Sequence, residues 1–185
     1  MNVKEAILSR RTIRKFEDRD VPFKLLSELV RLAAYAATGA NLQPLKFKIA
    51  QGAQLCEKLY PCTKWAGYLE NGAPEENERP HAYIAVLGDT NIKKQFECEA
   101  GAAITNMMLG AEEEGLATCW LGAIDREKIG QILDIPKDLA VVYLLAVGYP
   151  AQISRAVPMT DSVKYWQDAE GVINVPKRGI DEILL

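Results

Sequence analysis

The chain has 185 residues, of which 49% are hydrophobic and 25% are charged, and its formal net charge is −3. This balance is typical of one globular domain, residues 1–185, and it excludes an overall field that would draw the protein to nucleic acid or to a membrane surface. No run of about eighteen apolar residues is present for a membrane span, and the N-terminal sequence lacks the apolar core of a signal peptide, so we expect a cytoplasmic protein.

The first sixty residues predict three helices and one strand. Asn2 is suited to cap a helix that runs to about residue 10. Residues 22–38 carry an apolar stripe at helical spacing, with a proline in the first turn and a glycine after the last. The turn-rich loop TGANLQPL then leads into a half-buried strand at 46–50, and a short helix follows at about 53–60.

Residues 61–80 are predicted to be irregular, with an acidic run at 74–79 that is not expected to pack. Loops of this length are typical of functional lids or mobile segments, although a solvated excursion fits the sequence equally well. Because the segment contains Trp65 and Tyr68, one hypothesis is that it forms part of a pocket wall. A buried strand at 82–88 comes next.

The stretch 96–124 is the centre of the prediction: a long helix, a stop at Gly115 and a strand from 117. Small side chains along the helix allow another backbone to approach closely, at the cost of two interior glycines. These small residues are Ala100, Gly101, Ala102, Ala103, Gly110 and Ala111. We therefore expect a helix packed on several sides and a strand covered on both faces, which by themselves indicate no more than a core helix and a core strand.

After this stretch the sequence predicts a helix capped by Asp125, a long apolar strand at 139–149, and a mostly irregular tail at 150–185. Helices and strands interleave irregularly, which suits an α+β layered domain about as well as an α/β one. No internal repeat or linker divides the chain.

Metal and triad chemistry have little support in the sequence. The four cysteines form no C-x-x-C pair, whereas a structural zinc site needs about four closely spaced N or S ligands. We therefore expect no metal. The single histidine, His81, lies in a loop-like segment, which disfavours a histidine-dependent triad.

Basic residues gather at both ends of the chain. The segment 9–16 holds Arg10, Arg11, Thr12 and Arg14, and the first and last of these arginines share a face if the helix persists. Guanidinium groups bind phosphate bidentately, so the cluster is a candidate anion site. A solvated helix end and a nucleic-acid arm are the other interpretations, and no second basic patch with aromatic residues supports the latter. Lys177 and Arg178 could converge on the same phosphate.

Neither G-x-x-x-x-G-K nor a G-x-G-x-x-G after a strand is present, so side chains would have to hold a phosphate. The loop after the second helix adds amides and a hydroxyl beside a glycine: Thr38, Gly39, Asn41 and Gln43. Amide groups both donate and accept hydrogen bonds, which suits the edge of a heteroaromatic ring.

Together, RRTIRKF, NLQP and CWLGAI resemble the motifs R-R-S-x-R-x-F, N-x-Q-P-W and C-W-I-G of the nitroreductase family. The resemblance covers essentially the whole chain, although Leu45 stands where tryptophan is usual and the chain is short. It implies an α+β fold in which a central mixed or antiparallel sheet is flanked by helices, in an intertwined homodimer that binds FMN at the subunit interface.

The resemblance also assigns roles by position. Arg10, Arg11, Thr12 and Arg14 would hold the FMN phosphate, ribityl chain and ring edge, with Lys177 and Arg178 reaching the phosphate from the tail. Thr38, Gly39, Asn41 and Gln43 would border the flavin from the other subunit. Leu121, Gly122 and Ala123 would run past the ring, with the Gly122 N–H near N5 and Arg14 favouring negative charge at N1 and O2.

The implied activity is ping-pong electron transfer from NAD(P)H through FMN to a nitroaromatic, a quinone or a related small acceptor, with no protein nucleophile. A flavin-dependent reductive dehalogenase and a non-catalytic FMN-binding protein are the alternatives. A nucleic-acid binder is a third possibility, which the acidic net charge weakens.

Overall fold

The two most apolar segments of the chain form the centre of a four-stranded antiparallel sheet. In the computed structural model, which describes all residues from Met1 to Leu185, the strand order is β1-β2-β4-β3. The strands are β1 (Leu45–Gln51), β2 (Ala82–Asp89), β3 (Ala117–Leu121) and β4 (Leu139–Gly148). Because β2 and β4 lie between neighbours and are covered on both faces, their sequences are apolar almost throughout.

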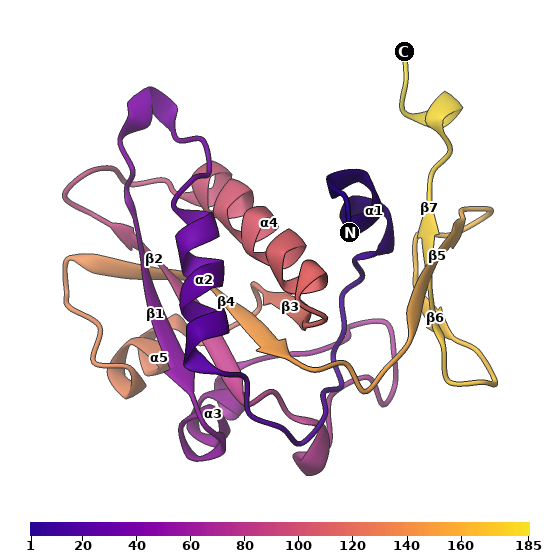
Figure 1. Cartoon of the computed structure of the whole chain (residues 1–185), viewed down its shortest axis with the longest axis horizontal. Helices are drawn as coiled ribbons and strands as arrows, with labels where there is room; N and C mark the ends of the chain where they lie inside the picture. The colour runs from indigo at the N-terminus through magenta and orange to yellow at the C-terminus, as the bar shows by residue number, and fades with distance from the viewer.

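Helices cover both faces of this sheet (Figure 1). They are α1 (Val3–Ser9), α2 (Phe23–Ala33), α3 (Ala53–Leu59), α4 (Glu97–Glu113) and α5 (Arg126–Ile132). Alternate residues of β2 point to opposite faces: Ile84 belongs to the core shared with α2 and α4, and Tyr83 to the core beside α3 and α5. One sheet thus supports two buried clusters.

The small residues of α4 serve close packing, as predicted. Ala100, Ala103 and Ala111 are fully buried. A Cβ added at Gly110 would lie 2.3 Å from Leu32 Cδ1, so α2 approaches α4 there more closely than alanine would allow without a shift of that side chain. The helix ends at Glu113, and Gly115 shortly after it has a φ of +70°, which glycine readily adopts.

Several predicted boundaries change. Helix α2 stops at Ala33 rather than near residue 38, because Tyr35 and Ala36 donate to carbonyls three residues back and tighten the last turn. Helix α4 begins at Glu97, and its N-cap residue Phe96 forms no side-chain cap bond. Strand β3 is buried at every residue except Trp120, which is 37% exposed although Thr118 on the same face is buried.

The tail is the largest departure from the prediction. Instead of being irregular, it forms a second sheet of order β5-β7-β6, with β5 (Ser154–Pro158) parallel to β7 (Ile173–Lys177) and β6 (Trp166–Gln167) antiparallel to it. The strands are short and half exposed, and Figure 1 shows them beside the main body. Their weak alternation explains why the sequence did not reveal them.

The segment 61–80 contains only two short 3₁₀ turns, η2 (Tyr60–Cys62) and η3 (Glu76–Glu78), and is otherwise irregular. Its acidic part is nevertheless fixed: Tyr60 Oη donates to the Pro74 carbonyl at 2.8 Å, and Phe16 N donates to the Glu78 carbonyl at 2.8 Å. Arg79 pairs with Glu57. The expectation that this run does not pack was therefore wrong.

The architecture is α+β, with antiparallel pairing throughout the main sheet, which settles the choice between the two fold classes. None of the helices combines the length and apolar character that a bilayer crossing requires.

Candidate functional site

The basic segment 10–16 is extended and lies beside the edge strand β3. Helix α1 ends at Ser9, so the helix does not persist through the segment and Arg10 and Arg14 do not share a helical face. Thr12 forms a parallel bridge with Thr118, and Ile13 N donates to the Thr118 carbonyl at 3.1 Å. These bonds fix the arginines against the strand that leads to residues 121–123.

The arginines of this segment have different surroundings. Arg11 folds back onto α1, where its Nη2 donates to the Leu8 carbonyl at 2.6 Å and its Nε to the Ser9 carbonyl at 3.3 Å. It thereby satisfies carbonyls that the helix end leaves free. Burial, and then the neighbouring Arg10, lower the pKa of the Arg11 guanidinium.

Arg10 and Arg14 form no ion pair with any acidic side chain, whereas Lys15 pairs with Glu78 at 2.9 Å. The Arg14 guanidinium lies over the ring of Tyr165, with 4.6 Å between the guanidinium carbon and the ring centroid. The backbone N–H of Arg14 donates to Gln152 Oε1 at 3.3 Å. Two half-buried cations therefore keep their charge uncompensated in a protein of net charge −3, which favours an anionic ligand.

Residues 121–123 follow β3 and expose backbone donors. Leu121 is 4% exposed and anchors the segment in the core. The N–H groups of Gly122 and Ala123 donate to no acceptor within the chain. Their carbonyls are occupied, by Arg126 Nη2 at 3.2 Å for Gly122 and by Lys64 N at 3.0 Å for Ala123. Two consecutive free donors can bind an acceptor-rich ring edge.

The loop 38–43 contains the 3₁₀ turn η1 (Gly39–Asn41) and is conformationally strained. Ala40, Asn41 and Gln43 have φ values of +49°, +54° and +48°, which side-chain-bearing residues rarely adopt. Gln43 N donates to Thr38 Oγ1 at 3.2 Å, which closes the loop. The Asn41 and Gln43 side chains are exposed.

Lys177 and Arg178 lie at the end of β7, in the tail sheet. Arg178 contacts Glu182 at 4.0 Å, and no hydrogen bond or ion pair joins either residue to the segment 10–16. Within one chain, then, the basic segment lies beside β3 and its extension, while the loop 38–43 and the pair 177–178 occupy separate places (Figure 1).

The structure adds two neighbours of Arg14 that sequence reasoning missed, Gln152 and Tyr165. Both lie in the tail that was predicted to be irregular, and no motif marks them. Tyr165 also packs against Tyr68 with ring centroids 5.1 Å apart. Trp65, in contrast, turns inward, donates to Thr63 Oγ1 at 2.7 Å and stacks on Tyr60, so only Tyr68 of these two aromatics stands near the arginine.

Comparison with known proteins identifies relatives across most of the chain. The model of the Nitroreductase family matches residues 7–83 and 79–149. A Methanothermobacter thermautotrophicus protein provisionally named NADH dehydrogenase/NAD(P)H nitroreductase is 29% identical over 159 residues, which covers 82% of this chain and 79% of that protein. The FMN reductase (NADPH) of Bacillus subtilis is 29% identical over 178 residues, covering 85% and 69%.

Among solved structures, a Desulfovibrio desulfuricans protein crystallised in complex with FMN superposes with a TM-score of 0.71 at 25% identity. The superposition covers 100% of this chain and 96% of the Desulfovibrio chain. The tail sheet therefore belongs to the region over which the two folds can be aligned.

Proposed function

This chain belongs to the nitroreductase family, and we propose that it is an FMN-dependent oxidoreductase that passes electrons from NAD(P)H to a small acceptor such as a nitroaromatic or a quinone. One observation carries the proposal. Arg10 and Arg14, which have no ion pair, and the free N–H groups of Gly122 and Ala123 occur along the same edge of the sheet. Charge and donors suit FMN, which has a phosphate at one end and an acceptor-rich ring at the other.

FMN supplies the hydride chemistry when it is bound, so the chain needs to bind, orient and tune it rather than provide a nucleophile. Arg10 and Thr12 offer a cation and a hydroxyl for the phosphate and ribityl chain. Arg14 offers positive charge to the ring edge, and a guanidinium close to a group that gains negative charge favours its reduction. The free Gly122 N–H would donate a hydrogen bond to the ring edge where hydride is exchanged.

The remaining predicted contacts call for a second subunit. In one chain, the loop 38–43 and Lys177–Arg178 are separate from the basic segment. We propose a homodimer in which the partner contributes Thr38, Gly39, Asn41 and Gln43, and in which the tail pair reaches the phosphate. Exposed apolar side chains support this: Val3, Ile7 and Leu8 on α1, and Ile180, Ile183 and Leu184 near the C-terminus.

A spectrum of the purified protein, before and after anaerobic addition of each nicotinamide, tests the proposal directly. We expect bound flavin, bleaching by NADH or NADPH, and recovery of the absorbance when a nitroaromatic or quinone is added. Light scattering should give twice the chain mass. Colourless protein that takes up no added FMN would refute the proposal, and flavin that no donor reduces would favour a binding protein without catalysis.

Substitution of one arginine tests the placement of the phosphate. Arg10→Ala should weaken FMN binding by about 1–3 kcal/mol, the value of a hydrogen bond to a charged group, as measured by fluorescence titration. Lys24→Ala, which removes an exposed cation at the start of α2, is the matched control and should leave the affinity unchanged. Equal dissociation constants for Arg10→Ala and the control would remove Arg10 from the site.

A further inference from the structure

Glu99 is an acidic side chain buried where no acidic residue was expected. It lies in the first turn of α4, is 5% exposed, and belongs to none of the motifs discussed above. Its Oε1 accepts a hydrogen bond from Lys93 Nζ at 2.6 Å, whereas its Oε2 is buried without any partner. A buried carboxylate with one unsatisfied oxygen is costly, and a fold retains such a group only if the arrangement is otherwise useful.

The neighbour of this carboxylate is the strained loop. A Cβ built on Gly39 would lie 3.6 Å from Glu99 Oε1, so the loop backbone passes directly beside the carboxylate. The hydrogen bond from Lys93 is the main cause that lowers the pKa of Glu99, and the N–H of Gly39 contributes in the same direction. The side chain is therefore a carboxylate at neutral pH, with Lys93 as its counterion and a loop N–H facing it.

The loop needs such a restraint. Three of its residues without glycine's freedom are left-handed, a combination that persists only where the surroundings impose it. Within the loop, the restraints are the Thr38 hydroxyl, which accepts from Gln43 N, and the short turn that closes on Gly39. None of these bonds joins the loop to the main body of the protein, and Glu99 occupies the point where α4 meets it.

We propose that Glu99 is a positioning residue that holds the loop 38–43 in the conformation in which its amide side chains meet the flavin. Lys93 keeps the carboxylate charged and in place, and Gly39 is the point of attachment. The inference rests on the proposed function for the identity of the ligand, but the attachment of the loop itself is independent of any cofactor.

Hydrogen exchange on the apoprotein tests the attachment. In Glu99→Gln, which preserves shape and removes the charge, the amides of residues 38–43 should exchange about tenfold faster, because the opening free energy of the loop falls by the value of a charged hydrogen bond. Amides of β2 and β4 should not change. Glu97→Gln is the matched control: it lies in the same helical turn and bonds only to Phe96 N, so it should leave the loop unchanged.

FMN titration of the same proteins tests the consequence. Glu99→Gln should raise the dissociation constant about tenfold while Glu97→Gln does not, and Glu99→Asp, which keeps the charge, should recover part of the loss. If Glu99→Gln does not fold, Lys93→Gln disturbs the same contact from a partly exposed side chain and should show the same pattern.

The outcomes separate the two proposals. Unchanged exchange of the loop in Glu99→Gln would overturn the role of Glu99, whatever the protein binds. Faster exchange with unaltered FMN affinity would also overturn it as a positioning residue for the flavin. A wild-type protein that binds no FMN would instead refute the proposed function, and the exchange data would then still decide whether Glu99 fastens the loop.

Discussion

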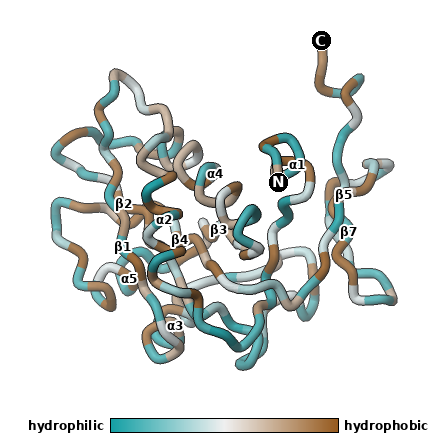
Figure 2. Tube along the Cα trace, viewed as in Figure 1, coloured by the Kyte–Doolittle hydropathy of each residue, from teal (hydrophilic) through white to brown (hydrophobic).

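The main sheet and the tail sheet are held by different forces. Helices cover both faces of β2 and β4, whose residues are mostly buried. Figure 2 shows that hydrophobic residues predominate along these two strands. The tail sheet has two fully or nearly buried side chains in its strands, Ile173 and Asn174, and mixes hydrophobic with hydrophilic residues. One region is stabilised mainly by apolar burial, and the other has to rely on polar contacts.

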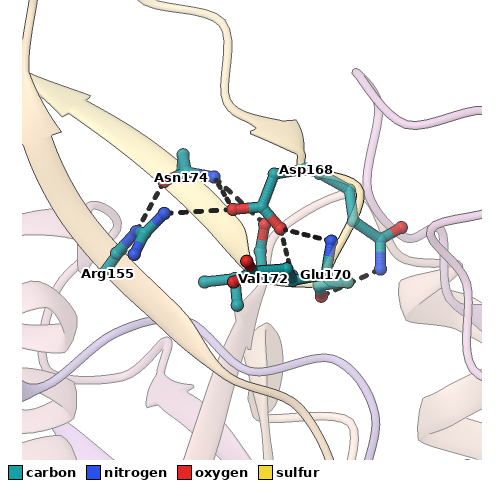
Figure 3. A network of polar contacts seen from close by, with 7 residues as sticks. Arg155, Asp168, Glu170, Val172 and Asn174 are labelled. Atoms are coloured by element: carbon teal, nitrogen blue, oxygen red, sulfur yellow. Dashed lines mark hydrogen bonds and ion pairs between the residues drawn. The ribbon is translucent and has the colours of Figure 1, made fainter.

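Those polar contacts converge on Asp168 (Figure 3). Its Oδ2 accepts from Asn174 Nδ2 at 2.9 Å and from Arg155 Nη2 at 3.1 Å, and its Oδ1 accepts from Val172 N at 2.9 Å. Arg155 Nε donates in turn to Asn174 Oδ1 at 2.7 Å. One carboxylate thus ties together β5, β7 and the turn that precedes β7. Because these contacts lie within the tail, we expect that the tail can loosen while the main core stays folded.

A substitution in the main core should destabilise the protein most. Leu145, in the middle of β4, is fully buried, so Leu145→Ala should lower the free energy of unfolding by about 2–5 kcal/mol through lost burial and a residual cavity. Urea denaturation measures this. The tail control is Ile153→Ala, where the side chain is 69% exposed, and its change should stay within about 0.5 kcal/mol. Comparable losses of stability in the two variants would contradict the conclusion that apolar burial stabilises the main core more than the tail.

A second core substitution should stabilise the protein. Tyr83 is fully buried, and its hydroxyl has no hydrogen-bond partner. Burial therefore raises the pKa of Tyr83 well above its usual value. Because an unsatisfied buried hydroxyl costs free energy, Tyr83→Phe should raise the stability by about 1 kcal/mol, seen as a higher urea midpoint. A lower midpoint would mean that the hydroxyl has a partner.

The smallest global effect is expected in the tail. Hydrogen bonds from Asn174 and then from Val172 lower the pKa of Asp168. A carboxyl with a depressed folded-state pKa stabilises above its ordinary pKa of about 3.9 and loses that contribution as pH falls through the folded value. Limited proteolysis should therefore cleave residues 150–185 faster in acid, below the folded-state pKa of Asp168, than at neutral pH.

In Asp168→Asn, the tail should be cleaved at neutral pH as fast as the wild-type tail is cleaved in acid. The rate of tail cleavage should then no longer depend on pH in this range. Glu170→Gln is the control, since that exposed side chain lies two residues away and forms no ion pair. Tail cleavage that is equally slow in Asp168→Asn and wild type would show that the sheet does not depend on this carboxylate.

The sequence predicted those parts of the fold that are stabilised mainly by apolar burial. The strands β2 and β4 and the helix α4 have strong apolar patterns, and each was predicted within a few residues. The tail sheet was missed because its strands are short and their partners lie in the tail itself, so stability comes from side chains such as Asp168 that leave no periodic signal.

For the site, motifs supplied the candidate residues, but they did not predict how these residues are arranged. The placement of Thr12 beside Thr118 depends on a bridge between segments far apart in the chain. Arg11 turned out to close α1, a use that its position in a basic run does not distinguish from phosphate binding. Tyr165 and Glu99 could be recognised only from contacts, because an isolated tyrosine or glutamate carries no pattern of its own.

The closure of α1 by Arg11 bears on when this helix becomes ordered during folding. A helix of seven residues is too short to persist in water, and it lies against α4, where the Glu112 carboxylate offsets part of the charge of Arg11. Helix α1 is therefore expected to become ordered only after α4, its packing partner far along the chain, has formed.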